Sequence, residues 1–169
     1  GVQITGPAAK QVAHAVSVLD KQGFDTIDIN MGCPVRKVVG AGCGSAILKE
    51  PERITETVLA SRVATNRPLS AKYRLGYTRE NVNVENTTER VVQANVDMFT
   101  VHGRTRSESY STNCDLSGIK AAVQVGFNLN QKVVKVGNGD IFSFDSADKM
   151  QKETGCDAVM VSRGALGNP

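Results

Sequence analysis

The chain has 169 residues, a mass of 18.0 kDa and a formal net charge of +3. Its 40% hydrophobic and 22% charged residues are ordinary for a globular domain and exclude a disordered or fibrous chain. No apolar run approaches the ~20 residues of a membrane span, and no basic region precedes an apolar stretch at the N-terminus. We therefore expect neither a membrane protein nor a secretory signal. The mildly basic balance does not by itself identify a nucleic-acid partner.

The predicted elements alternate between short apolar or β-branched runs and helical patterns. The predicted strands are Val2–Thr5, Thr26–Met31, Leu69–Arg74, Met98–His102, Lys132–Val136 and Ala158–Ser162. The predicted helices cover about 7–21, a stretch opened by Pro51, about 86–95, a stretch capped by Asp115, and about 143–154. In the second helix, Ile54, Val58 and Leu59 are expected on one face.

The spacing of these strands predicts an α/β fold. At about 30 residues per unit, six βα units match six-eighths of a (β/α)₈ TIM barrel, and a doubly wound open sheet is the alternative. Polar side chains at the end of nearly every strand favour the barrel, because barrel active sites are built at that face. These residues are Asn30, Cys33, Lys72, Arg74, His102, Arg104, Asn138, Asp140, Ser162 and Arg163.

The loops after the last two strands indicate phosphate binding. Gly137-Asn138-Gly139-Asp140 and Ser162-Arg163-Gly164 are rich in glycine, which lets backbone N–H groups approach an anion. The segment from Gly40 to Gly44 lacks a complete dinucleotide fingerprint, and we expect a flexible loop there.

Two of these side chains, Lys72 and His102, are open to several readings. Lys72 would hold an anionic ring, form a Schiff base or reach water at the strand end. His102 is a ligand, an acid or base, or a hydrogen-bonded core residue, whereas His14 is expected on a helix surface without a role. Five basic residues and no acidic one occur from Arg62 to Arg79. This run is interpreted either as a solvated face or as a contact with nucleic acid.

The cysteines, Cys33, Cys43, Cys114 and Cys156, form no C-x-x-C pair. This spacing excludes a zinc ribbon and a thioredoxin-like motif, and we expect reduced thiols, no bound metal and a cytoplasmic protein. Cys33 follows a predicted strand in a Gly/Pro turn, which favours a reactive thiol over a structural one. Such a thiol is a nucleophile or, being mostly protonated at neutral pH, a general acid.

A series of segments resembles, in order, the motifs of the tRNA-dihydrouridine synthase family. They are Asp28-Ile29-Asn30-Met31-Gly32-Cys33-Pro34, Gly42-Cys43-Gly44-Ser45-Ala46, Lys72-Tyr73-Arg74-Leu75-Gly76, Val101-His102-Gly103-Arg104-Thr105-Arg106, Asn138-Gly139-Asp140-Ile141 and Ser162-Arg163-Gly164-Ala165. The resemblance runs from Gln3 to Gly164. It implies an FMN-dependent TIM barrel that reduces particular uridines of tRNA to 5,6-dihydrouridine, with NADPH recharging the flavin.

The resemblance also implies a role for each matching residue. Cys33 would protonate C5 of the uracil as the catalytic acid, and Asn30 and Arg74 would hold the base. Arg104 and Arg106 would face the RNA. The cofactor-binding residues would be Gln3 and Lys72 at the flavin ring and His102, Asn138, Gly139, Asp140, Ser162 and Arg163 at its phosphate.

Against that family the chain begins at the third strand, so residues 1–169 correspond to strands 3 to 8 of a partial FMN-binding barrel domain. We expect the family's first two βα units and its C-terminal helical tRNA-binding domain to lie outside this sequence, and we expect a monomer that is inactive as this piece alone. Two alternatives remain open. One is another FMN- or phosphate-binding barrel enzyme, such as a Lys72 Schiff-base lyase, and the other is a non-catalytic RNA-binding remnant.

Overall fold

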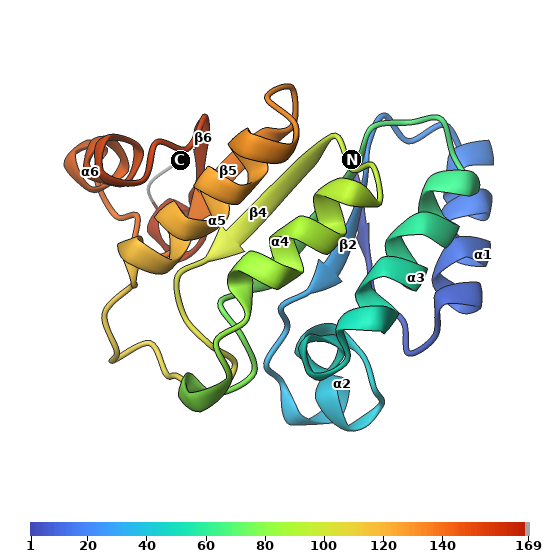
Figure 1. The fold of residues 1–169 in the computed structure, drawn as a ribbon, viewed down its shortest axis with the longest axis horizontal. Coiled ribbons are helices and arrows are strands. Elements are labelled where there is room, and N and C mark those ends of the chain that lie inside the picture. The colour runs from blue at the N-terminus through green and yellow to red at the C-terminus, as the bar shows by residue number, and fades with distance from the viewer. Residues whose placement is uncertain (168–169) are drawn as a thin grey trace.

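A computed structural model describes residues 1–167, in which six strands alternate with helices along the chain (Figure 1). The strands are β1 (Val2–Ile4), β2 (Ile27–Met31), β3 (Leu69–Arg74), β4 (Met98–His102), β5 (Val134–Asn138) and β6 (Ala158–Met160). The α-helices are α1 (Ala9–Lys21), α2 (Arg36–Gly40), α3 (Pro51–Val63), α4 (Val84–Gln93), α5 (Leu116–Leu129) and α6 (Phe144–Thr154). The 3₁₀ turns are η1 (Gly44–Lys49), η2 (Arg79–Asn81) and η3 (Arg163–Ala165).

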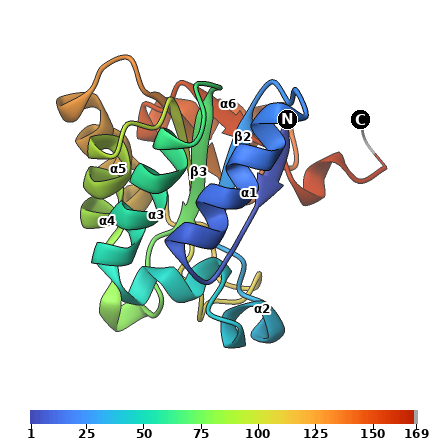
Figure 2. The ribbon, with the colours of Figure 1, turned by 90° about the vertical axis from the view of Figure 1, so that its right-hand side faces the viewer.

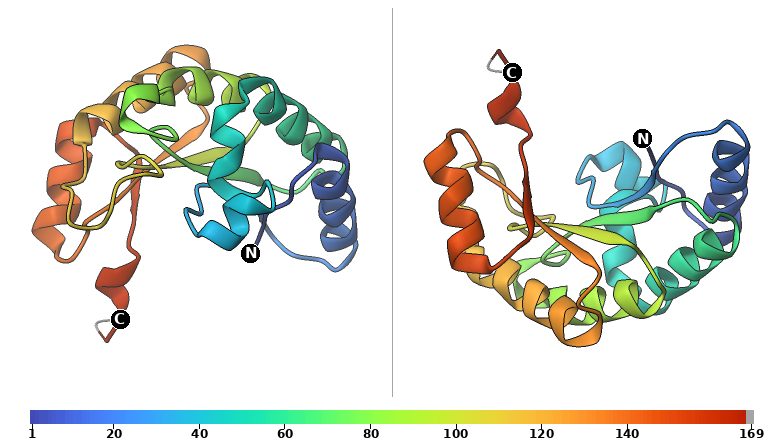
Figure 3. Two further views of the ribbon diagram at one scale, coloured as in Figure 1. Left: turned by 90° about the horizontal axis from the view of Figure 1, so that it is seen from below. Right: turned by 90° about the horizontal axis from the view of Figure 1, so that it is seen from above.

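The strands form one parallel sheet in which each strand pairs with the next one along the chain. Seen from the ends of the sheet, helices α1, α3, α4, α5 and α6 lie in an arc on its outer side, and the N-terminus lies on the open inner side (Figure 3). A doubly wound sheet reverses its strand order and carries helices on both faces. The structure therefore confirms an incomplete TIM-barrel-like α/β fold and excludes the doubly wound alternative.

Alternation along the strands separates the core from the inner face. In β3, Leu69, Ala71 and Tyr73 are fully buried against the helices, whereas Lys72 and Arg74 face inward. Figure 2 shows helices α3, α4 and α5 together on one side of β3. The inner face of the sheet is thereby left to polar side chains, and these build the site described below.

The helix boundaries follow from local chemistry at two helices. The Asp115 carboxylate caps α5 by accepting hydrogen bonds from the backbone N–H groups of Ser117 and Gly118. Helix α6 begins with a capping box at Ser143 and ends at Gly155, which adopts the left-handed conformation with a φ of 74°. The start of α5 and both ends of α6 agree with the sequence prediction.

The loop expected between Gly40 and Gly44 is a turn at residues 41–43, bounded by the end of α2 and by η1, whose residues from Gly44 to Leu48 are buried. Two other local predictions were wrong. Leu59 is 46% exposed, because a residue one step past Val58 turns away from the buried face of α3. Strand β5 begins two residues late, because the Asn130 side chain and carbonyl hold Lys132 and Val133 in a turn.

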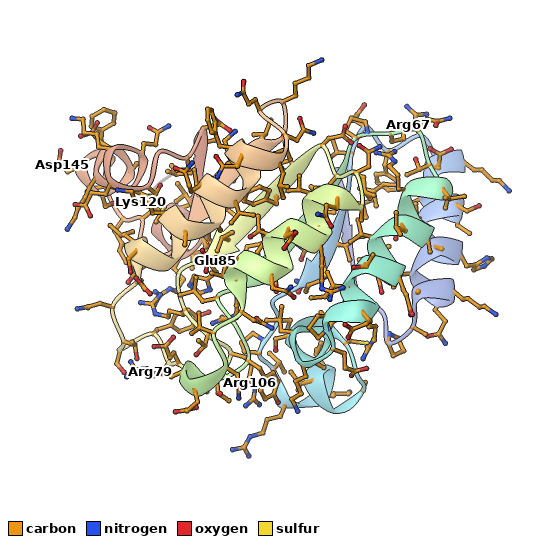
Figure 4. The ribbon with its side chains drawn as sticks, in the orientation of Figure 1. Arg67, Arg79, Glu85, Arg106, Lys120 and Asp145 are labelled. Carbon is orange, nitrogen blue, oxygen red and sulfur yellow. The ribbon has the colours of Figure 1, made fainter. Side chains whose placement is uncertain are left out.

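The basic run between Arg62 and Arg79 does not form one surface. Arg67 lies at one end of the molecule and Arg79 at the other (Figure 4). Arg62 is paired with Asp97 at 2.9 Å. Since Lys72 and Arg74 face inward from β3, the run serves three different parts of the fold.

Substitution of Phe99 tests the packing between the sheet and the helices. Phe99 is fully buried, its ring centroid lies 6.0 Å from that of Tyr73, and it packs against Gly126 of α5. Phe99→Ala is expected to lower the free energy of unfolding by about 3–5 kcal/mol, measured by urea denaturation. The control Phe144→Ala, at a side chain that is 83% exposed, should change it little. Equal effects of the two substitutions would contradict this packing.

Candidate active site

The register of the sheet brings polar side chains from consecutive strands into rows on the inner face. Asn30 of β2 pairs with Lys72 of β3. One level further along the strands, Arg74 pairs with His102 of β4, and His102 pairs with Asn138 of β5. Because all strands are parallel, these rows lie at the carboxyl ends of the strands, where barrel active sites are built.

A cavity of about 370 Å³ opens at this end of the sheet. This volume suits a small-molecule ligand or cofactor. Its lining includes every site residue predicted from the sequence except Arg104 and Arg106. Those that line it are Gln3, Asn30, Cys33, Lys72, Arg74, His102, Asn138, Gly139, Asp140, Ser162 and Arg163.

The turn that carries Cys33 is braced by Asn30. The Asn30 side-chain oxygen accepts hydrogen bonds from the backbone N–H groups of Gly32 at 3.0 Å and Cys33 at 2.9 Å. The Asn30 side-chain amide also donates to Oε1 of Gln3 at 2.8 Å. Arg74 supports the same turn, since its Nε donates to the carbonyl of Gly32 at 2.8 Å. Cys33 is therefore held, half-exposed, at the cavity wall.

Asp28 belongs to the same network, although the sequence pattern did not predict a role for it. Its carboxylate accepts from Nε2 of Gln3 at 2.7 Å and from Oγ of Ser70 at 2.5 Å. The sequence signal was the alternation Ile27-Asp28-Ile29-Asn30, which places a carboxylate on the inner face beside a recognised site residue. Asp28 thus orients Gln3 and provides the negative charge near Lys72.

The pKa of Lys72 is lowered by its surroundings. Burial of its ammonium, together with the nearby Arg74 charge, lowers the pKa of Lys72 to about 8, and Asp28 partly opposes this shift. Lys72 is consequently still mostly protonated at pH 7 but loses its proton within the mildly basic range. The side chain faces a cavity and can bind an anion or react as an amine.

His102 is neutral at physiological pH. Burial is the main cause and the positive charges of Arg74, Lys72 and Arg104 add to it, so the pKa of His102 falls to about 3 despite Asp140. A neutral imidazole has one nitrogen that donates and one that accepts. His102 therefore acts here as an oriented hydrogen-bonding group.

Arg104 does not face solvent, contrary to the expectation from the sequence. Its side chain is 1% exposed and pairs with Asp140 at 2.5 Å. The reason is a tight turn after β4, in which the N–H of Arg104 bonds to the carbonyl of His102 at 2.7 Å and redirects the chain. Arg104 lies under the loop of residues 105–114 and cannot contact an RNA strand directly.

Arg106 lies outside the cavity but at the same end of the molecule (Figure 4). Its guanidinium carbon is 5.2 Å from the centre of the Tyr77 ring, and the ammonium of Lys49 is 4.0 Å from the same ring. These two cations and the aromatic ring form a rim beside the cavity. From this position Arg106 can contact a polyanion at the surface.

The two glycine-containing loops meet at the far side of the cavity. The Asn138 side-chain amide donates to the carbonyl of Met160 at 2.8 Å and to Oγ of Ser162 at 3.1 Å, which ties β5 to β6. Gly139 has a φ of 130°, and a Cβ there would lie 2.6 Å from Sγ of Cys114. Only glycine fits this position, and it leaves the backbone open toward the cavity.

Asp140 connects these loops to two arginines. Its Oδ2 accepts from Arg104, and its Oδ1 accepts from Arg163 at 3.2 Å. Burial works to raise the pKa of Asp140, but the Arg104 hydrogen bond and charge, the Cys114 N–H and the Arg163 charge outweigh it and hold this pKa below its ordinary value. The carboxylate thus stays ionised and organises its neighbours.

Cys114 is half-buried between the loops after β4 and β5. Burial, reinforced by the Asp140 charge, raises the pKa of the Cys114 thiol to about 11. The thiol is therefore protonated and unreactive at neutral pH.

Within residues 1–167, no group of three or more His, Cys, Asp or Glu side chains is placed to hold a metal ion. Over the same described stretch, no helix has the length and hydropathy needed to cross a bilayer.

The reactivity of Cys114 provides a test of this electrostatic description. Alkylation of Cys114 by iodoacetamide is expected to be slow at pH 8 and to accelerate only as the pH approaches about 11. Asp140→Asn removes the charge that helps to raise the pKa, so its profile should move to lower pH. Mass spectrometry of the Cys114 peptide measures both profiles, with Cys43 in the same digest as a reference. An unshifted profile would contradict the role of Asp140.

Comparison with known proteins agrees with this geometry. The family model described as "Dihydrouridine synthase (Dus)" matches residues 1–169. A "Probable tRNA-dihydrouridine synthase" of Rhizobium leguminosarum bv. phaseoli is 34% identical over 168 residues, which are 99% of this chain and 51% of that protein. The "tRNA-dihydrouridine synthase B" of Xanthomonas axonopodis pv. citri is 36% identical over 171 residues, covering 99% of this chain and 49% of that protein. The chain thus spans about half the length of these curated relatives.

Solved structures support the fold alone. A crystal structure of oxaloacetate acetylhydrolase superposes with a TM-score of 0.65 at 14% identity, covering 95% of this chain and 57% of that one. A mandelate racemase/muconate lactonizing enzyme from Roseiflexus sp. gives a TM-score of 0.62 at 15% identity, covering 94% and 38%. The match of the family model to all residues, together with these relatives, shows that the chain belongs to the dihydrouridine synthase family.

Proposed function

We propose that the protein is a flavin-dependent tRNA-dihydrouridine synthase that reduces the C5–C6 double bond of uridines in tRNA. The observation that carries the proposal is the content of one cavity. A braced cysteine lies on one wall, and a cluster of anion-binding groups lies on the other. Residues 1–169 would supply strands 3 to 8 of the catalytic FMN-binding barrel of a monomeric, cytoplasmic enzyme, and a helical tRNA-binding domain would lie outside this stretch.

The donor set of the cavity fits a phosphorylated flavin. Gly139 leaves its backbone open beside Asn138, and Ser162 and Arg163 supply further donors for a phosphate. Gln3 and Lys72 lie on the wall nearer β1, where an ammonium favours an electron-rich ring. When bound, FMN recharged by NADPH supplies the hydride for C6 of the uracil.

Cys33 is the general acid in this proposal. Its Sγ–H donates the proton that C5 of the uracil needs as C6 gains hydride, and the resulting thiolate is reprotonated by solvent. Asn30 holds the turn in which the thiol lies, and Arg74 ties that turn to the carbonyl of Thr105 at 2.9 Å. These contacts place the acid before the substrate arrives, which is how proton transfer at a fixed position becomes efficient.

The substrate must reach this cavity from a stacked RNA. A uracil inside a helix or a structured loop is accessible only after it leaves its stack. Arg106, at the rim, is exposed enough to contact a phosphate of the RNA, whereas Arg104 acts from within the protein. Arg79 lies at the same end of the molecule but is paired with Glu108 at 2.7 Å.

Replacement of Cys33 tests the proposed acid. In the full-length protein, which includes the tRNA-binding domain, purified and loaded with FMN, Cys33→Ala is expected to lower the rate of dihydrouridine formation in tRNA by about 100-fold or more, because the proton donor is lost. The visible flavin spectrum should be retained. Cys43→Ala, in the neighbouring loop, is the matched control and should keep the wild-type rate. Full activity of Cys33→Ala would assign the proton to another group, and no dihydrouridine in the wild type would refute the proposed function.

The charge of Lys72 makes flavin binding depend on pH. Lys72 carries its proton below a pKa of about 8 and loses it above, so the ammonium near the ring disappears as the pH rises. We expect the Kd of FMN, measured by fluorescence quenching, to rise several-fold between pH 7 and pH 9.5. Lys72→Met should bind more weakly at pH 7 and show a flatter profile. The control Lys120→Met, on the outer helix α5 (Figure 4), should follow the wild type.

One observation favours a second candidate function. An amine with a pKa lowered to about 8 is a better nucleophile near neutral pH than an ordinary lysine, which suits a Schiff-base lyase. Borohydride trapping of a carbonyl substrate on Lys72, with no flavin bound, would favour this reading. The braced Cys33 turn has no role in such a reaction, and this is why we place it second.

A further inference from the structure

The buried guanidinium of Arg104 is the most connected group at the cavity. Its Nε donates to the carbonyl of Thr112 at 2.7 Å, and its Nη2 donates to the carbonyl of Tyr110 at 3.4 Å and to Asp140 at 2.5 Å. Its Nη1 lies 3.3 Å from Nε2 of His102. An arginine has no acceptor atom. The contact with His102 can therefore form only if Nε2 of His102 accepts.

This contact determines where His102 carries its proton. A ring that is neutral and whose Nε2 accepts must be protonated on Nδ1. Within the described residues, Nδ1 has no hydrogen-bond partner, and the ring lines the cavity beside Gly139. The opposite tautomer would turn an N–H toward the Arg104 guanidinium and present a lone pair to the cavity. Such a lone pair repels an anion.

Arg104 also closes a ring of contacts around the phosphate side of the cavity. Asp140, bound to Arg104, also accepts from Arg163. The guanidinium carbon of Arg163 lies 3.9 Å from the centre of the Tyr110 ring, and the Tyr110 carbonyl accepts from Arg104. Arg104, which does not line the cavity, thus joins the loops after β4 and β5 directly, and the turn after β6 is joined to them through Asp140 and Tyr110.

We propose that Arg104 is a positioning residue that fixes His102 as an Nδ1–H donor toward the phosphate monoester of the ligand. Arg104 does not contact the ligand itself. The identity of the ligand as FMN rests on the proposed function, whereas the tautomer of His102 does not. A donor that is already oriented needs no reorganisation when the anion binds. Removing Arg104 should therefore weaken binding of the phosphate more than binding of the flavin ring.

The tautomer is measured by long-range ¹H–¹⁵N NMR correlations on the purified protein. The sequence has two histidines, and His14, exposed on α1, provides the reference signal. Wild-type His102 is expected to show a protonated Nδ1 and an unprotonated Nε2. Arg104→Lys keeps the positive charge but loses the planar fork, and it should give a mixture of tautomers. A wild-type His102 protonated on Nε2 would overturn the proposal whether or not any variant folds.

Ligand discrimination is the second readout. FMN and riboflavin share a ring and differ in the phosphate, and their Kd values are compared by fluorescence quenching. Arg104→Lys should weaken FMN about tenfold, the worth of one hydrogen bond to a charged group, and leave riboflavin unchanged. The matched control Arg67→Lys, at the other end of the molecule, should change neither (Figure 4). An equal loss for both ligands would indicate a merely structural role and overturn the proposal.

A double substitution separates positioning from other effects. In His102→Asn the side-chain amide nitrogen takes the place of Nδ1 and donates without a tautomer to choose. FMN discrimination should therefore survive in His102→Asn, and adding Arg104→Lys should then cost little. A full tenfold loss in the double variant would contradict the proposal. If neither flavin binds the wild type, the proposed function fails, while the NMR result still decides the role of Arg104.

Discussion

The in-register pairing of six parallel strands is the constraint on which the site depends. It places Arg74, His102 and Asn138 in one row, with Lys72 one level below. A slip of one residue in any pair would turn that strand's polar side chains into the helix layer and its apolar ones into the cavity. Burial of Tyr73 and Phe99 on the outer side resists such a slip, because both rings would have to leave the core. Apolar packing on the outer face of the sheet thus fixes the register that positions the polar side chains on its inner face.

The charge balance of the cavity follows from this arrangement. Lys72, Arg74 and Arg104 bring three positive charges close to His102, and their combined field, added to burial, keeps the imidazole neutral. Asp28 and Asp140 offset part of this charge from opposite sides of the cavity. Both carboxylates are held by protein donors, so the remaining positive potential is directed at whatever occupies the space between them. Such a space favours an anionic ligand over a neutral one.

Burying a charged group costs desolvation free energy, which is offset only when the group is paired and hydrogen-bonded. Arg104 is such a buried and paired charge. Each nitrogen of its guanidinium has an acceptor, and one of these acceptors, Asp140, lies 36 residues away along the chain. A residue that at first resembles a surface contact is consequently the internal link between the loop after β4 and the loop after β5. Asn30 likewise makes several hydrogen bonds with one side chain, which closes the Cys33 turn and also donates to Gln3.

The sequence by itself determined the local features that depend on short-range chemistry. Alternation in Ile27-Asp28-Ile29-Asn30, the Asp115 cap, the Gly155 end of α6 and the polar residues after each strand were all readable, because each follows from neighbours a few positions away. The order of strands and the gathering of Cys33, His102 and Asn138 around one space also followed, since parallel strands share one carboxyl edge.

Only the tertiary structure decided the fate of side chains whose surroundings come from distant segments. Arg104 and Arg106 are two residues apart and of one type, yet one is buried beneath a loop and the other lies at the rim. The turn after β4 and the carboxylate of Asp140, 36 residues away, make that difference. Likewise, the burial of η1 and the division of the basic run between opposite ends of the sheet arise from packing between elements, which no local pattern encodes.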